Sequence, residues 1–258
     1  MKISVFEKKD LFIAIFGILK NASSFICIYF EEEKMHIQGM DKSHVCLFDG
    51  NLYKNWFDTY EKDTKELEFI CIDATVFFNI ISSSHDSQII HIDFKTSSDS
   101  INIELLSKDT TEKGPFNKYF KIPLANFDYE LMDIPKVDYD AEFSISSKKL
   151  YEITSQMISF GNDIHIQCSE EKINLITNGI HGEMMVNIPI EDLNEYAICE
   201  GENIDINFSL NYIHKMCIST KLSLEIELFI SIQYPMKIKY DLGNNSNLIF
   251  FIAPKINE

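Results

Sequence analysis

The segment Lys9–Phe30, KDLFIAIFGILKNASSFICIYF, gives the clearest indication of the architecture. Its apolar spacing predicts a helix over Lys9–Ala22, followed after a short serine turn by a strand over Phe25–Phe30. The same order recurs about 138 residues later, where the helix-like Lys148–Ser159 leads into the strand-like Ile164-His165-Ile166. The recurrence predicts a chain built from two halves of the same architecture.

Further segments repeat in the same order. Ala74–Ser83 and Leu210–Ser219 are both predicted helices, and each is followed by strand-like segments such as Ile89–Phe94 and Ser223–Ile230. Short polar turns such as Gly243-Asn244-Asn245 join neighbouring strands, which favours antiparallel sheets with a few helices on one face. The predicted fold class is α+β.

A linker is predicted between the halves, over Pro123–Asp140 (PLANFDYELMDIPKVDYD). It carries prolines and carboxylates and has no sustained periodicity, which is typical of an extended surface connection. The predicted domains are therefore 1–122 and 141–258, joined by 123–140. Leu131, Met132, Ile134 and Tyr139 are apolar residues within this linker, so it is expected to dock or to help form a binding groove.

The composition limits the function. The chain has 258 residues, 40 acidic against 23 basic, and a formal net charge of −17, which argues against a protein that coats nucleic acid with a general basic surface. Its six cysteines are well separated and lie mostly in apolar runs, so we expect buried reduced thiols in a reducing compartment. The apolar Leu11–Leu19 is too short to span a bilayer; a signal peptide is the alternative to the buried helix that we favour, and we expect a soluble intracellular protein.

No catalytic motif stands out. The sequence lacks GxxxxGK[ST], GxGxxG, HExxH and GxSxG, and its seven histidines are scattered. Carboxylates are too plentiful for any two to be chosen as an acid/base pair without geometry. We therefore expect no metal, no cofactor and no enzymatic activity, and favour a binding or scaffolding role over an enzyme with a nonobvious site.

One family resemblance covers essentially the whole chain. Gln38–Leu47 (QGMDKSHVCL) resembles the proliferating cell nuclear antigen family of DNA sliding clamps, and Phe250–Ile256 (FFIAPKI) resembles the closing motif of that family. Trp56–Tyr60, Ser159–Asp163, and Ile134-Pro135 followed by Tyr139 also match in order. The resemblance implies two similar clamp domains per subunit, with antiparallel sheets outside and helices lining a homotrimeric ring around duplex DNA.

The resemblance also implies where partners bind. Client proteins of this family insert a short helical turn into a groove beneath the linker, and clients here would include DNA polymerase and repair proteins. The matching groove positions are Met40, His44, Val45, Leu47, Leu131, Ile134, Pro135, Tyr139, Pro235, Phe251, Ile252, Ala253 and Pro254. Asp41 is the expected contact for a clamp loader or a client.

Two further sets of residues follow from the same resemblance. The expected DNA-facing lysines are Lys20, Lys113, Lys149, Lys215 and Lys221. The expected subunit contact pairs a strand at about Asn117–Ile122 with an edge strand at Glu183–Ile188. Its apolar contacts are Tyr119, Phe120, Met184, Met185 and Val186.

The chain departs from the family pattern on its helices. Ile13 and Ala14 stand where the family often has lysines, and Glu152 and Asn211 occupy other basic positions. These departures predict a weak direct attraction to DNA. Glu170 replaces the lysine that accepts ubiquitin in the family. A specialised clamp-fold subunit of a hetero-oligomer, from a checkpoint clamp or a viral transcription system, is the alternative; the expected location is the nucleus, or a viral replication compartment.

Overall fold

The computed structural model describes residues 1–62, 68–95, 98–108, 114–126 and 130–255. The chain divides into two compact units. Unit 1 comprises Met1–Gly39, Asp49–Leu131 and Leu242–Leu248, and unit 2 comprises Met40–Phe48, Met132–Asp241 and Ile249–Glu258. The main division thus falls inside the predicted linker. The assignment of Met40–Phe48 to unit 2 depends on contacts between residues far apart in the sequence, which the repeat pattern does not contain.

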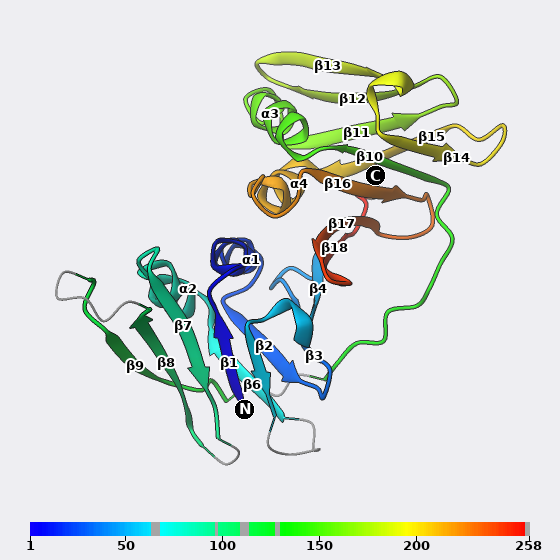
Figure 1. Ribbon diagram of the computed structural model, residues 1–258. Coiled ribbons are helices and arrows are strands. Elements are labelled where there is room, and N and C mark those ends of the chain that lie inside the picture. The colour runs from blue at the N-terminus through cyan, green and yellow to red at the C-terminus, as the bar shows by residue number, and fades with distance from the viewer. Residues whose placement is uncertain (63–67, 96–97, 109–113, 127–129, 256–258) are drawn as a thin grey trace. The chain divides into compact units, whose positions relative to one another are not determined.

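Unit 1 contains two helices and antiparallel sheets (Figure 1). One sheet has the order β5 (Thr59–Glu61), β1 (Lys2–Val5), β7 (Gln88–Asp93), β8 (Ser100–Ser107) and β9 (Lys118–Pro123). A second set of neighbouring strands comprises β6 (Glu68–Asp73), β2 (Phe25–Phe30), β3 (Lys34–Met40) and β4 (Cys46–Tyr53). The helices are α1 (Lys9–Ala22) and α2 (Ala74–Ser82), with a 3-10 turn η1 (Lys54–Trp56).

The core of unit 1 is aromatic where the two helices meet. Phe12 and Phe16 of α1 and Phe77 of α2 are at most 1% exposed. The Phe16 and Phe77 ring centroids are 4.6 Å apart. Asp73 caps α2 by accepting a hydrogen bond from the Val76 N–H, so this helix begins where an N-cap residue permits. The apolar stripe that predicted α1 is thus the surface that holds it in the unit.

Unit 2 repeats this plan. Its four-stranded sheet has the order β13 (Gly182–Pro189), β12 (Lys172–Gly179), β11 (Asp163–Cys168) and β15 (Ile204–Ser209). A further run of neighbours comprises β14 (Glu195–Ile198), β10 (Ala141–Ser146), β16 (Glu225–Ile230), β17 (Met236–Gly243) and β18 (Ser246–Ile252). The remaining elements are α3 (Ser147–Met157), α4 (Leu210–Cys217) and the 3-10 turn η2 (Ile190–Asp192).

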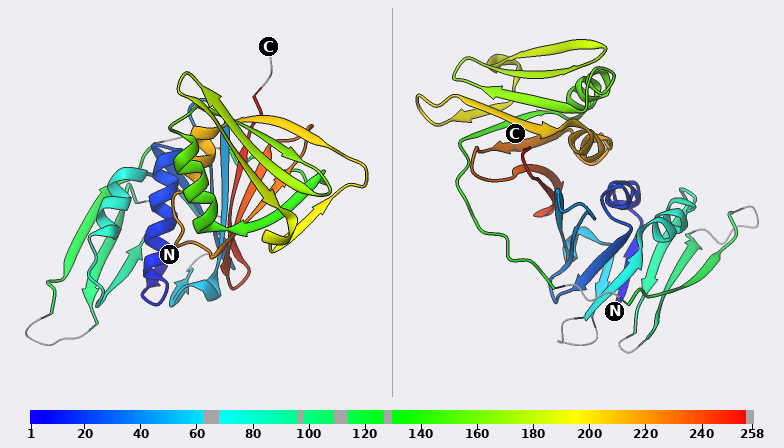
Figure 2. Two further views of the ribbon diagram at one scale, coloured as in Figure 1. Left: turned by 90° about the horizontal axis from the view of Figure 1, so that it is seen from above. Right: turned by 180° about the vertical axis from the view of Figure 1, so that it is seen from behind.

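The duplication and the α+β class are confirmed. Each unit begins with a strand, helix and strand, namely β1-α1-β2 and β10-α3-β11. In each, the two helices pack side by side, α1 against α2 and α3 against α4, as the views in Figures 1 and 2 agree. Among the described residues, no helix is both long and apolar enough to traverse a lipid bilayer.

The cysteines correct one prediction. Cys27 of β2 lies directly opposite Cys71 of β6, and the two form a disulfide bond that is almost fully buried. The expectation of reduced thiols was therefore wrong for this pair. Each cysteine lies in a separate apolar run, so only the register of two strands distant in sequence brings them together. Ala125 packs against the same cluster, and its N–H donates to the Cys71 carbonyl at 2.7 Å, which fixes the start of the linker on unit 1.

Candidate functional site

The loop between β3 and β4 is built around the carboxylate of Asp41. Its Oδ1 accepts hydrogen bonds from the Val45 and Cys46 N–H groups, each at 2.7 Å. Its Oδ2 accepts from the Ser43 N–H at 2.9 Å and from the Tyr212 hydroxyl of α4 at 2.6 Å. The loop therefore folds back on a single side chain, and all of these groups belong to unit 2.

Asp41 is only 7% exposed, and its negative charge is stabilised by the hydrogen bonds that its carboxylate accepts from the protein. Burial alone would raise the pKa of Asp41, but the Tyr212 hydroxyl and the three backbone N–H groups outweigh that effect and hold the pKa below its usual value. The prediction of Asp41 as a direct loader or client contact is corrected: the carboxylate is turned inward, and its hydrogen bonds shape the loop.

The Asp41 network displays the next side chains of the loop. His44 adopts a left-handed backbone conformation with φ of 57°, which is uncommon outside glycine and is stabilised here by the closed turn around it. The His44 side chain is exposed, and those of Val45 and Leu47 are half-buried. The loop thus carries three of the predicted groove residues, one polar and exposed and two apolar and half-buried.

The C-terminal segment joins this loop. The Ala253 N–H donates to the Val45 carbonyl at 2.9 Å, so the two segments that carry the strongest resemblance lie side by side in unit 2. Phe251, Ala253 and Pro254 are half-buried. Ile252 is 0% exposed, so its predicted place on the groove surface is wrong. In β18 successive side chains face opposite sides, and Ile252 faces the core while Phe251 does not.

The linker contributes a second group of contacts. The Tyr139 hydroxyl donates to the Pro235 carbonyl at 3.3 Å, and the Tyr139 ring centroid lies 5.6 Å from that of Phe229. Lys237 lies over both rings, its Nζ 5.0 Å from the Tyr139 centroid and 3.4 Å from that of Phe229. Burial raises the pKa of the Tyr139 hydroxyl, so it remains a donor at neutral pH.

Pro235 immediately precedes β17, and Ala253 immediately follows β18. Since β17 and β18 are sheet neighbours joined by a tight turn, both residues lie at the same end of this hairpin. The structure therefore brings together, within unit 2, the predicted groove residues of the loop, the C-terminal segment and the linker.

The other predicted groove positions differ in exposure. Met40 and Ile134 are half-buried and Pro135 is exposed, all within unit 2. Leu131 is 40% exposed and belongs to unit 1.

The predicted DNA-facing lysines divide into two kinds. Lys149 on α3, Lys215 on α4 and Lys221 just after α4 are exposed. Lys20 on α1 is half-buried, with its Nζ 3.6 Å from the centroid of the Phe78 ring in a cation–π contact. Lys113 lies outside the described residues.

Lys9, at the first turn of α1, is a buried lysine. Although it is charged, it is only 5% exposed, and its Nζ donates to the carbonyls of His85, Asp86 and Gln88 at 2.6, 2.8 and 2.8 Å. Its role is structural, and the sequence does not indicate this, because a lysine at a helix end is ordinarily expected to be exposed to solvent.

The predicted subunit-contact residues lie on outermost strands. β9 is at one edge of its sheet in unit 1, and β13 is at one edge of its sheet in unit 2. Tyr119 and Met185 are 67% and 54% exposed, whereas Phe120, Met184 and Val186 are half-buried. Both strands therefore have the free edge and the apolar surface that pairing with another strand requires.

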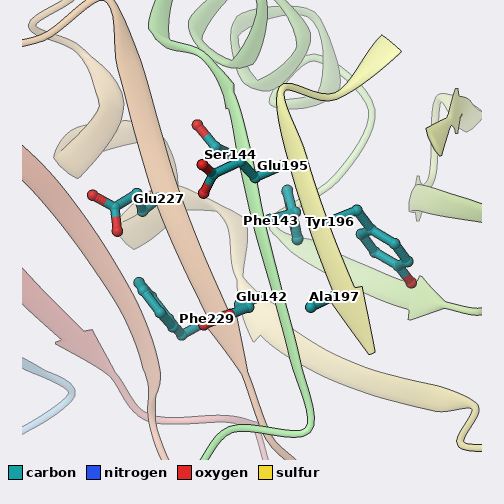
Figure 3. A pocket seen from close by; sticks show the side chains of 8 residues that line it. All are labelled: Glu142, Phe143, Ser144, Glu195, Tyr196, Ala197, Glu227 and Phe229. Atoms are coloured by element: carbon teal, nitrogen blue, oxygen red, sulfur yellow. The ribbon is translucent and has the colours of Figure 1, made fainter. Parts of the chain in front are cut away.

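Two adjoining cavities on unit 2 had no signal in the sequence. The first, of about 380 Å³, lies over β10, β14 and β16 (Figure 3) and is lined by Glu142, Phe143, Ser144, Glu195, Tyr196, Ala197, Glu227 and Phe229. The second, of about 460 Å³, includes Tyr139 and Lys237 and so adjoins the linker contacts. In the part of the chain that the structure describes, no cluster of three or more His, Cys, Asp or Glu side chains is arranged to hold a metal ion.

Fold and site together define a class: a duplicated α+β protein in which β9 and β13 are outermost strands, and in which the loop, the C-terminal segment and Tyr139 of the linker meet in the second unit. Two family models match the chain, that of the proliferating cell nuclear antigen N-terminal domain over residues 2–143 and that of its C-terminal domain over residues 133–255. The chain belongs to the proliferating cell nuclear antigen family.

Individual relatives match over most of the chain. Proliferating cell nuclear antigen 2 of Plasmodium falciparum is 24% identical, over 96% of this chain and 97% of the relative. Proliferating cell nuclear antigen of Chaetomium thermophilum is 24% identical, over 86% of this chain and 85% of the relative. The DNA polymerase sliding clamp of Methanococcus maripaludis is 25% identical, over 90% of each chain.

Proposed function

We propose that this chain is one subunit of a homotrimeric ring that encircles duplex DNA and recruits replication and repair proteins through the groove of unit 2. Its family is one of non-catalytic processivity factors, and the chain acts as a DNA sliding clamp. The ring and the groove are the means that we assign to that function. DNA polymerase and a clamp loader are the partners that it requires.

The observation that carries the proposal is the hydrogen bond between the Ala253 N–H and the Val45 carbonyl. It joins the loop and the C-terminal segment into one partly apolar surface, bordered by the contact between Tyr139 and Pro235. A surface with separated apolar positions and an acidic linker beside it suits a short helical peptide that has hydrophobic anchors and basic flanks.

The two free strand edges support self-association. An edge strand buried against a different edge of an identical copy makes a head-to-tail contact, and such contacts close into a ring when the rotation per subunit permits. β9 and β13 supply two different edges in one chain. Closing both of these edges in every subunit also removes two exposed strand edges that would otherwise promote aggregation.

Encirclement reconciles the acidity of the chain with DNA as a partner. A net charge of −17 opposes binding by general attraction to phosphates, whereas a closed ring holds DNA without tight phosphate contacts and remains free to slide. The scarcity of cations on the helices is also what favours the alternative, a specialised clamp-fold subunit that acts in a hetero-oligomer. We assign the protein to the nucleus, or to a viral replication compartment if its source is a virus.

Light scattering after size-exclusion chromatography tests the ring. The parent chain is expected at three times the subunit mass, and Met185→Glu, which places a charge on the β13 edge, is expected to shift it to monomer. Ile180→Glu is the matched control, because Ile180 is 95% exposed in the turn before β13 and lies off the edge strand. A parent chain that is monomeric at micromolar concentration, with no trimer on crosslinking, would refute the homotrimer.

Peptide binding and polymerase assays test the recruitment. A fluorescent peptide with one aliphatic and two aromatic anchors on a helical turn, flanked by lysines, is expected to bind the parent and to lose affinity at least tenfold with Phe251→Ala. Phe116→Ala, at a residue that is 91% exposed in unit 1, is the control. Equal peptide binding by the parent and Phe251→Ala would contradict the groove. In the polymerase assay, on a primed circular template with polymerase and loader, the parent chain is expected to give longer products than a reaction without it.

A further inference from the structure

We infer that Tyr212 is a positioning residue for the client groove, because its hydroxyl ties helix α4 to the loop that bears His44 and Val45. The inference rests on the proposed function, since it concerns the same groove. Its hydroxyl is bound to the Asp41 carboxylate, and it acts on the groove through Asp41.

The first step is that Asp41 holds the loop and Tyr212 holds Asp41. Three of the four hydrogen bonds to the carboxylate come from backbone N–H groups of the loop itself, at Ser43, Val45 and Cys46. These bonds give the loop its shape, but they do not fix it to the rest of unit 2. The bond from the Tyr212 hydroxyl, at 2.6 Å, ties the carboxylate at the centre of the loop to α4, in addition to the bond from the Ala253 N–H to the Val45 carbonyl.

The second step is that the phenol is held in place by its helix. The other side of α4 is firmly anchored: Leu210, Ile213, Met216 and Cys217 are at most 1% exposed. The Leu210 N–H donates to the Asn162 carbonyl at 2.8 Å, and the Tyr240 hydroxyl donates to the Met216 carbonyl at 2.7 Å. Because both ends of this short helix are tied to the core, the Tyr212 hydroxyl is a fixed point for the loop.

The third step concerns protonation. Burial and the hydrogen bond to Asp41 raise the pKa of Tyr212, and the pKa of Asp41 is lowered, so a neutral phenol donates to a carboxylate throughout the neutral range. A charge-assisted bond of this kind is stronger than one between neutral groups.

The fourth step links the attachment to binding. Val45 lies at the end of the Asp41 network and also accepts the hydrogen bond from Ala253, so movement of the loop displaces both walls of the groove at once. If the loop populates the groove-forming position for only a fraction of the time, the apparent association constant for a client falls to that fraction of its intrinsic value. Lys215, an expected DNA-facing residue, lies over the same Tyr212 ring at 6.0 Å, so the network extends to the exposed face of α4.

The decisive variant is Tyr212→Phe, which removes the hydroxyl and keeps the ring. Tyr151→Phe on the adjacent helix α3 is the matched control, because the Tyr151 ring stacks on His214 at 5.5 Å and no hydrogen bond of its hydroxyl is found within the described ranges. The anchor peptide with flanking lysines is titrated against both full-length variants. Tyr212→Phe is expected to weaken peptide binding about three- to tenfold, and Tyr151→Phe to leave it unchanged.

A double-mutant cycle separates positioning through Asp41 from a general structural effect. If Tyr212 acts through the carboxylate, then Tyr212→Phe added to Asp41→Asn weakens binding no further than Asp41→Asn does alone. Hydrogen–deuterium exchange is expected to speed up at the Ser43, Val45 and Cys46 amides in Tyr212→Phe, with the oligomeric mass unchanged. If Tyr212→Phe lowers the melting temperature, these local exchange rates and the cycle still decide the question.

Three results would overturn the inference: parent-like peptide affinity in Tyr212→Phe, fully additive effects in the cycle, or unchanged exchange at the three loop amides. Failure of the parent chain to bind the peptide at all would instead count against the proposed function. The two failures are therefore distinguishable.

Discussion

Lys9→Met tests whether a buried lysine holds unit 1 together. The Lys9 ammonium donates to three backbone carbonyls, of which that of Gln88 is fully buried, while those of His85 and Asp86 are nearer to solvent. Methionine preserves the apolar stem but donates no hydrogen bond. The substitution therefore leaves one buried acceptor unsatisfied and returns the other two to water.

The magnitude follows from these three carbonyls. An orphaned buried acceptor costs about 1–3 kcal/mol, and each lost bond to a partly solvated carbonyl adds roughly 0.5 kcal/mol. The desolvation of the ammonium, which lowers the pKa of Lys9, is relieved by the substitution and offsets part of the loss. We expect Lys9→Met to lower the free energy of unfolding by about 2–3 kcal/mol.

The single tryptophan makes the assay local. Trp56 belongs to unit 1, is 2% exposed and donates from its indole N–H to the Leu242 carbonyl at 3.0 Å. Its fluorescence during urea unfolding therefore reports on the unit that contains Lys9. Lys149→Met, at an exposed position of α3, is the control and is expected to change the free energy by less than about 0.5 kcal/mol. An equal and small effect of both variants, compared at the same subunit concentration, would refute the structural role of Lys9.

Two further predictions concern titration and oxidation. Burial holds the pKa of His214 below its usual value of about 6.5, so between the lowered pKa and about 6.5 the unfolded chain binds more protons than the folded chain. The free energy of unfolding should therefore fall as the pH drops through this range. Urea unfolding at a series of pH values should show a smaller fall for His214→Gln. The Cys27–Cys71 bond predicts four reactive thiols in the denatured, unreduced chain and six after reduction, and six before reduction would contradict it. The double variant Cys27→Ala/Cys71→Ala should lower the free energy of unfolding by about 2–4 kcal/mol.

The sequence predicts those parts of the fold that depend on local periodicity. The helix α1 has the bounds Lys9–Ala22 that the apolar spacing gave, and the duplication appears in the order of elements. Local patterns succeed here because a helix must bury one stripe and a strand one face, and both demands leave a period in the sequence. The groove segments were found by resemblance, since periodicity alone assigns Val45 and Leu47 to an ordinary core.

The parts that escaped prediction depend on partners distant in sequence. Asp41 resembles an exposed loop carboxylate until Tyr212, on a helix of the second half, is seen to donate to it. Lys9 resembles a solvated helix end until the carbonyls after α2 surround it. In both cases a charged side chain is buried because several backbone dipoles converge on it, and that convergence has no signature in one sequence.

The thin supply of cations decides how a clamp of this kind would hold DNA. In unit 1, the ammonium of Lys9 donates to backbone carbonyls and that of Lys20 lies over the Phe78 ring. The predicted DNA-facing lysines that are exposed among the described residues all belong to unit 2, and they are Lys149, Lys215 and Lys221. Counterion release scales with the number of phosphates neutralised, so a subunit with few free cations gains little affinity from attraction. On the proposed function, closure of the ring must then supply the retention that charge does not. An assembly that depends on closure in this way is expected to slide readily and to require a loader.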